Sequence, residues 1–170
     1  MKVASNSASG TEVVLALRGP GALLGELSAI DRWPVSATVT ALEAVTALVV
    51  PHFEFERYLQ NNGRVAFELM RQLTVRLRDA DRKRIEFGSF DTTGRVAARL
   101  VELAERFGTQ TAQGLRIGLP LSQDELAGWT GSSREAVTKA LRTLREEGTI
   151  QTGRMHVIVH DLAALRARAQ

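Results

Sequence analysis

Residues 121–147 (LSQDELAGWTGSSREAVTKALRTLREE) constrain the fold more than any other part of the chain. They predict two short helices separated by a tight turn. Ser122 suits the N-cap of the first helix, and Glu125 stands where a capping box places its carboxylate. Gly131 permits a turn conformation that other residues enter only with strain. Ser133 can then cap the second helix.

The second helix is expected to have one apolar and one polar face. The apolar positions at helical spacing are Ala136, Val137, Ala140, Leu141 and Leu144. The polar positions near the helix start are Arg134, Glu135, Thr138, Lys139 and Arg142. This pattern meets the needs of a DNA-reading helix-turn-helix. Two amphipathic helices joined by glycine also occur in other helical proteins, so the surrounding chain must decide.

The surrounding elements predict a winged helix. They are a helix over 92–107 capped by Asp91, a strand over 115–119, hairpin strands over 149–151 and 156–160, and a terminal helix over 162–169. Residues 108–114 are expected to form a polar loop. Arg154 lies in the hairpin turn, at the tip of the wing, where a DNA phosphate would be in reach.

The first fifty residues have the composition of β structure. Runs over 13–17, 36–42 and 44–50 are rich in apolar and β-branched residues and are separated by glycine and proline, which predicts a meander or roll. Such a short β region makes a poor free-standing core and would leave open strand edges. A short helix over 52–61 is expected next.

A long helix is predicted from Gly63 to about Gly88, with Gly88 and Ser89 as a hinge. Its apolar residues follow a heptad pattern whose central members are Met70, Leu73, Leu77 and Ala80, flanked by Ala66, Arg84 and Phe87. This seam favours parallel pairing in a homodimer. An ordinary core helix with two apolar sides is the alternative.

Composition excludes several classes of protein. The chain has no cysteine, so disulfides, thiolate catalysis and a cysteine-ligated iron–sulfur cluster are excluded. Its three histidines lack metal-ligand spacing, and no catalytic residue, metal site or enzyme activity is predicted. The net charge of +3 is compatible with nucleic-acid binding. Without a signal peptide or a long apolar run, a cytoplasmic location away from the membrane is expected.

The motifs together resemble the Crp/Fnr family of bacterial transcription regulators over essentially the whole chain. The matching stretches are 25–28 (GELS), 34–39 (PVSATV), the heptad helix, 90–97 (FDTTGRVA) and 131–137 (GSSREAV). The resemblance implies an α+β chain with a partial cyclic-nucleotide-binding-type β-roll over 1–60, a dimerisation helix and hinge over 61–89, and a winged-helix DNA-binding domain over 90–170. Family rolls have about twice as much strand before the long helix, so an N-terminal truncation is expected.

The resemblance also implies a function and its residues. It indicates a sequence-specific regulator that binds a pseudo-palindromic DNA site as a homodimer, with RNA polymerase as a further candidate partner. The family's base-reading positions match Arg134, Glu135 and Lys139; arginine can donate to guanine and glutamate can accept from cytosine. The expected phosphate contacts are Ser122, Ser133 and Arg154.

The effector pocket departs from the family pattern. Gly25, Glu26 and Ser36 match the cyclic-nucleotide cassette, but Val35 replaces the arginine that holds the cyclic phosphate. Ala80 likewise offers no hydrogen bond to an adenine. Cyclic AMP is the candidate effector, although these differences argue against tight binding, and no other cofactor is predicted. The alternative function is a small-molecule sensor or protein-interaction module with a vestigial winged helix.

Overall fold

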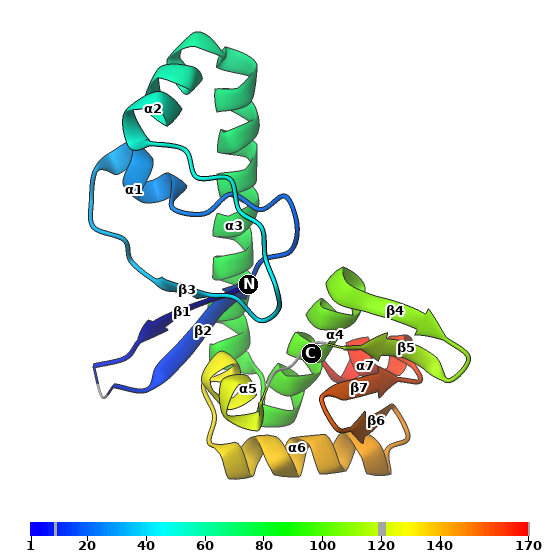
Figure 1. Ribbon diagram of the computed structural model, residues 1–170. Coiled ribbons are helices and arrows are strands. Elements are labelled where there is room, and N and C mark those ends of the chain that lie inside the picture. The colour runs from blue at the N-terminus through cyan, green and yellow to red at the C-terminus, as the bar shows by residue number, and fades with distance from the viewer. Residues whose placement is uncertain (9, 119–121, 170) are drawn as a thin grey trace. The chain divides into compact units, whose positions relative to one another are not determined.

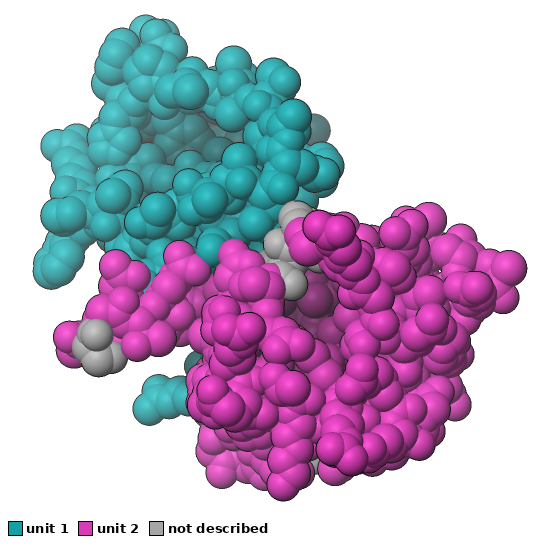
Figure 2. Space-filling model, turned by 60° about the horizontal axis from the view of Figure 1, so that its bottom comes forward, with its two compact units in different colours: residues 1–5, 16–84 teal, residues 6–15, 85–170 magenta. Residues whose placement is uncertain are grey.

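The computed structural model describes residues 1–8, 10–118 and 122–169 (Figure 1). The chain forms two compact units. Unit 1 consists of residues 1–5 and 16–84, and unit 2 of residues 6–15 and 85–170 (Figure 2). The predicted α+β class is confirmed: a small β domain, a long helix and a C-terminal winged helix follow one another along the chain.

The N-terminal half contains a small sheet and two short helices. Strands β1 (Lys2–Asn6), β2 (Glu12–Leu17) and β3 (Thr38–Thr40) form a sheet in the order β2-β1-β3. Strands β1 and β3 are antiparallel, with Val3 opposite Val39. Helix α1 (Glu26–Asp31) lies between β2 and β3 in the chain, and α2 (His52–Asn61), which has the predicted bounds, follows β3.

Several β predictions for this half were wrong in detail. Strand β2 confirms the run over 13–17, but the run over 36–42 contributes only the three residues of β3. No strand forms over 44–50, where Leu48 and Val49 are exposed. β1 was missed, and α1 was expected to be β structure. Valine-rich sequence favours an extended backbone, but a strand exists only where a neighbour supplies hydrogen bonds.

The predicted long helix is α3 (Gly63–Ser89). Residues 63–84 belong to unit 1 and residues 85–89 to unit 2. Gly88 and Ser89, the predicted hinge, are the last residues of the helix. Among the residues that the structure describes, no helix is long and apolar enough to cross a membrane.

Unit 2 is a winged helix, as predicted. Its helices are α4 (Thr92–Phe107), α5 (Gln123–Thr130), α6 (Arg134–Glu146) and α7 (Leu162–Arg168). Its strands β4 (Gly108–Thr111), β5 (Gly114–Ile117), β6 (Ile150–Gly153) and β7 (His156–Val159) form an antiparallel sheet in the order β4-β5-β7-β6. β4 replaces the predicted loop. Position 119, the end of one predicted strand, and Leu121, the start of the helix-turn-helix, lie outside the described residues.

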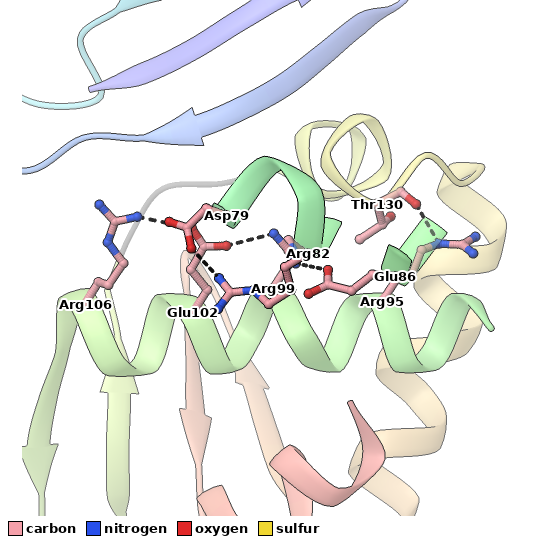
Figure 3. Close-up of polar contacts among 8 residues, drawn as sticks. All are labelled: Asp79, Arg82, Glu86, Arg95, Arg99, Glu102, Arg106 and Thr130. Atoms are coloured by element: carbon pink, nitrogen blue, oxygen red, sulfur yellow. Dashed lines mark hydrogen bonds and ion pairs between the residues drawn. The ribbon is translucent and has the colours of Figure 1, made fainter. Parts of the chain in front are cut away.

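The core of unit 2 is apolar and contains a buried ionic cluster. Its fully buried side chains include Val96, Leu100, Val137, Leu144 and Leu165. The Arg99 guanidinium on α4 pairs with Glu86 near the end of α3 and, at 2.8 Å, with Glu102 (Figure 3). It also lies 5.6 Å from the centre of the Trp129 ring on α5. Because a buried charge is costly unless it is paired, this cluster ties the last turns of α3, which belong to unit 2, to α4.

Candidate nucleic-acid interface

The two helices of the helix-turn-helix begin at well-formed caps. The Ser122 hydroxyl accepts a hydrogen bond from the Glu125 N–H at 3.1 Å, and a Glu125 carboxylate oxygen accepts from the Ser122 N–H at 2.8 Å. This is the predicted capping box. Gly131 ends α5 in the left-handed region with φ 57°, and Ser133 then caps α6 by accepting from the Ala136 N–H at 3.2 Å.

The structure brings the predicted base-reading residues together on one face of α6. Arg134, Glu135 and Lys139 are exposed and, with Thr138 and Arg142, line a shallow open depression. The opposite face of α6 is buried, with Val137, Ala140, Leu141 and Leu144 in the core. In Figure 1, α5 lies at one end of α6 and the β6–β7 hairpin at the other. The helix is therefore packed on one side and open along its polar side.

Two side-chain contacts join the first turn of α5 to this polar face. The Thr138 hydroxyl donates to Gln123 Oε1 at 2.8 Å. Arg134 Nη1 lies 3.5 Å from Asp124 Oδ2, in an ion pair whose two side chains are largely exposed. Sequence reasoning missed both Gln123 and Asp124 as members of this surface, because their approach to α6 depends on how the two helices cross.

Glu135 is held in its ionised form. Hydrogen bonds from its own backbone N–H and from the Ser133 side chain, with the charge of Arg134 adding to them, lower the pKa of Glu135 below its ordinary value. A carboxylate only accepts hydrogen bonds, and the amino group of a cytosine requires such a partner. The ionised Glu135 thus has the acceptor oxygens that such an amino group requires.

The wing carries the third predicted phosphate contact. Arg154 is exposed in the turn between β6 and β7, and its carbonyl oxygen lies 3.0 Å from Nδ1 of His156. The Arg145 guanidinium on α6 donates to the Thr152 hydroxyl on β6 at 3.2 Å. The wing is therefore tied to the same helix that presents the base-reading residues.

Arg95 connects the start of α4 to the turn of the helix-turn-helix. Its guanidinium donates to the Phe90 carbonyl at 2.7 Å, the Thr130 carbonyl at 2.8 Å and the Ser132 hydroxyl at 3.2 Å. The Phe87 ring of α3 lies 5.9 Å from this guanidinium. A Cβ added to Gly131 would lie only 2.7 Å from the same ring. Sequence reasoning could not find these contacts of Arg95, because the residues that make them are far apart along the chain.

The three residues of the predicted effector cassette, all in unit 1, differ from one another in backbone conformation and in burial. Gly25 adopts the left-handed region with φ 80° and precedes α1. Glu26 is buried, and its carboxylate pairs with Arg76 of α3, which also donates to the Leu23 carbonyl at 3.0 Å. The Ser36 side chain is exposed. An open depression of unit 1 is lined by Ser28, Arg32, Trp33, Val35, His52, Phe53 and Glu56.

Comparison with known proteins accounts for this architecture. A family model described as a Crp-like helix-turn-helix domain matches residues 94–168, and one described as a cyclic nucleotide-binding domain matches residues 1–62. The chain is 32% identical over 170 residues to the CRP-like cAMP-activated global transcriptional regulator of Mycobacterium tuberculosis, covering all of this chain and 76% of that protein. The chain belongs to the Crp/Fnr family.

Further relatives agree with this assignment. The Cyclic AMP receptor protein of Thermus thermophilus is 35% identical over 157 residues, covering 92% of this chain and 69% of that protein. Among solved structures, a CRP/FNR-family transcriptional regulator from Thermus thermophilus aligns with a TM-score of 0.75 at 25% identity, covering 99% of this chain and 82% of that one. A CooA mutant from Carboxydothermus hydrogenoformans aligns with a TM-score of 0.80 at 20% identity, covering 99% and 74%, and supports the fold alone.

Family membership gives the class of protein. This Crp/Fnr protein is a helix-turn-helix transcription regulator and not an enzyme. Its helix-turn-helix implies DNA as a partner.

Proposed function

We propose that this Crp/Fnr regulator binds a pseudo-palindromic DNA site as a homodimer, with α6 of each copy in the major groove. The observation that carries the proposal is α6 itself, which is buried along its apolar face and exposed along the face of Arg134, Glu135 and Lys139. A two-fold pair would present two such helices about 34 Å apart, which is one turn of B-form DNA.

The individual residues have separate roles in this proposal. Arg134 donates to guanine O6 and N7, Glu135 accepts from cytosine N4, and Lys139 contacts a third base without the planar fork of arginine. The phosphate contacts, which set register and orientation, are Ser122, Ser133 and Arg154. Residues 90–170 form the DNA-binding domain, residues 61–89 the dimerisation helix with its hinge, and residues 1–60 the sensor domain.

The dimer is proposed to form along the heptad seam of α3. Met70 and Leu77 are large apolar residues with exposed side chains, and Leu73 and Ala80 complete the same stripe. Leu77→Glu should place a charge in the seam and yield monomers in sedimentation equilibrium. Val75→Glu is the matched control, because Val75 is similarly exposed on α3 but lies off the seam. Dimers of the Leu77→Glu variant would contradict this pairing.

Mobility shifts on an inverted-repeat duplex at two salt concentrations test DNA binding. Affinity should fall steeply as salt rises, because protein cations release counterions from the phosphates. Arg134→Ala should cost about 1–3 kcal/mol and relax preference at one base pair in each half-site. Salt-independent binding, or no shift at micromolar protein, would contradict the proposal. Equal weakening on every sequence would make Arg134 a phosphate contact instead.

Regulation is proposed to occur in the cytoplasm, with RNA polymerase as the further partner of the DNA-bound dimer. The Mycobacterium tuberculosis relative is named as cAMP-activated. In this chain Val35 replaces the arginine expected by resemblance, and the Glu26 carboxylate is already paired with Arg76. We therefore expect weak cyclic AMP binding, measurable by calorimetry on the whole chain. Micromolar affinity would contradict this expectation.

A further inference from the structure

The Arg134 side chain lies beside the Asp124 carboxylate, and its charge also acts on Glu135. Asp124 Oδ2 is 3.5 Å from Arg134 Nη1, and the ionised Glu135 is the next residue on α6. Asp124 therefore opposes the positive charge that would approach DNA. A negative charge on a surface that faces phosphates is unfavourable for binding in general, so its position next to Arg134 calls for a functional reason.

Both partners of the ion pair are carried by helical backbone. Asp124 lies in the first turn of α5, between the two residues of the Ser122–Glu125 capping box, and Arg134 is the first residue of α6 after its Ser133 cap. The neighbouring Gln123–Thr138 hydrogen bond of 2.8 Å joins the same two helix starts. The two helix starts thus hold the backbone of Asp124 and Arg134 in place and keep the carboxylate within reach of the guanidinium.

We propose that Asp124 is a specificity-determining residue that orients Arg134 for guanine and disfavours its use on phosphates. A guanidinium has five N–H donors, so Arg134 can keep its ion pair with Asp124 at Nη1 while other donors reach guanine O6 and N7. A phosphate that approaches Arg134 instead meets the nearby carboxylate, which repels it. This inference rests on the proposed DNA-binding function.

In this proposal Asp124 has opposite effects on binding to the selected site and on binding to random DNA. Because Asp124 already restricts the rotamers of Arg134 in the free protein, Arg134 loses less conformational entropy when it binds guanine. Repulsion by Asp124 weakens contacts that carry no sequence information. Asp124→Asn should therefore tighten binding to random DNA, steepen the salt dependence of that binding by up to about one unit of logarithmic slope, and lower the preference for the selected site by roughly three- to tenfold.

The test uses fluorescence anisotropy of the full chain on three duplexes. These are a site selected by the wild-type protein from a random library, the same site with the guanine read by Arg134 replaced in both halves, and a random duplex. Glu105→Gln is the matched control, since it removes the same charge and an exposed ion pair of 2.7 Å with Arg166 on another part of unit 2. Asp124→Glu retains the carboxylate and should keep most of the preference.

Two outcomes distinguish the inference from its premise. If the wild-type protein selects no sequence, the proposed function fails and the inference fails with it. If the wild-type protein discriminates but Asp124→Asn does so equally well, only the inference fails. The loss of preference caused by Asp124→Asn must also disappear in an Arg134→Ala background, because Asp124 acts on base reading through that arginine, whereas its direct repulsion of phosphates persists there. An undiminished loss of preference there would overturn the proposal, and thermal melting of Asp124→Asn shows whether the variant is folded.

Discussion

Unit 2 and unit 1 contain similar large apolar residues, but unit 2 buries many of them and unit 1 leaves many exposed to solvent. In unit 2, large apolar side chains close into a core, and Val96, Val137, Leu144 and Leu165 are completely buried. In unit 1, many side chains of the same kinds face solvent, including Trp33, Val35, Leu48, Val49 and Phe53. Hydrophobic stabilisation follows the apolar area removed from water and not the type of residue. The stability of the winged helix therefore resides in its own core.

The two tryptophans allow this difference to be measured. Trp129 in unit 2 is 3% exposed, whereas Trp33 in unit 1 is 76% exposed. A Trp33→Phe background leaves Trp129 as the only tryptophan of the chain. Its fluorescence during chemical denaturation then reports the unfolding of unit 2, and circular dichroism reports the whole chain.

The largest effect is expected from the buried ion pairs. Arg99→Ala removes the buried cation that pairs with Glu86 and Glu102 and should lower the free energy of unfolding of unit 2 by about 3–5 kcal/mol. Arg76→Ala removes the partner of Glu26 in unit 1, but a quarter of the Arg76 side chain is exposed, so water can reach the site and the loss should be smaller. Equal losses in the two variants would remove this contrast between the units.

A matched pair of leucine substitutions comes next. Leu144 is fully buried in unit 2, and its replacement by alanine should cost about 2–5 kcal/mol through lost burial and the remaining cavity. Leu48 is 92% exposed in unit 1, and the same replacement there should change stability by no more than about 0.5 kcal/mol. A large loss for Leu48→Ala would show that the N-terminal region has a core that includes this side chain.

Two glycines with positive φ offer a smaller contrast. Gly131→Ala in unit 2 should cost about 1–2 kcal/mol in backbone strain and more through collision with the Phe87 ring. Gly21→Ala in unit 1 meets open space and should show the strain alone. Phe87→Ala should relieve part of the Gly131→Ala loss in a double-mutant denaturation experiment. Strict additivity would mean that the ring is not the obstacle.

The smallest effect concerns an exposed group of unit 2. The pKa of Glu135 is below its ordinary value, so its ionisation stabilises the folded state above the ordinary glutamate pKa, and this contribution is lost as pH falls through the lowered value. Carboxyl NMR titration should show the low pKa, and Ser133→Ala should raise it, because one hydrogen bond to the carboxylate is lost. An unchanged pKa in that variant would assign the shift to the backbone N–H and Arg134.

The predictions from sequence succeeded where structure depends on neighbours along the chain. The helix over 52–61, the long helix and the capped α4 follow from spacing and end signals, and α2 and α4 have the predicted bounds. The strand predictions for the N-terminal half were confirmed only in part, because a strand forms only where another strand pairs with it. The run over 44–50 has suitable residues and forms no strand, whereas β1 was missed and pairs with β3.

The sequence by itself determined the helix-turn-helix of this Crp/Fnr regulator. The Ser122–Glu125 capping box, the left-handed Gly131 and the apolar spacing of α6 are all set within a few residues, where propensity and local hydrogen bonds act. Only the tertiary structure decided which side chains from other elements reach that motif. The packing of α5 against α6 places Asp124 beside Arg134, and the packing of α4 against residues 85–89 of α3 buries Arg99 against Glu86.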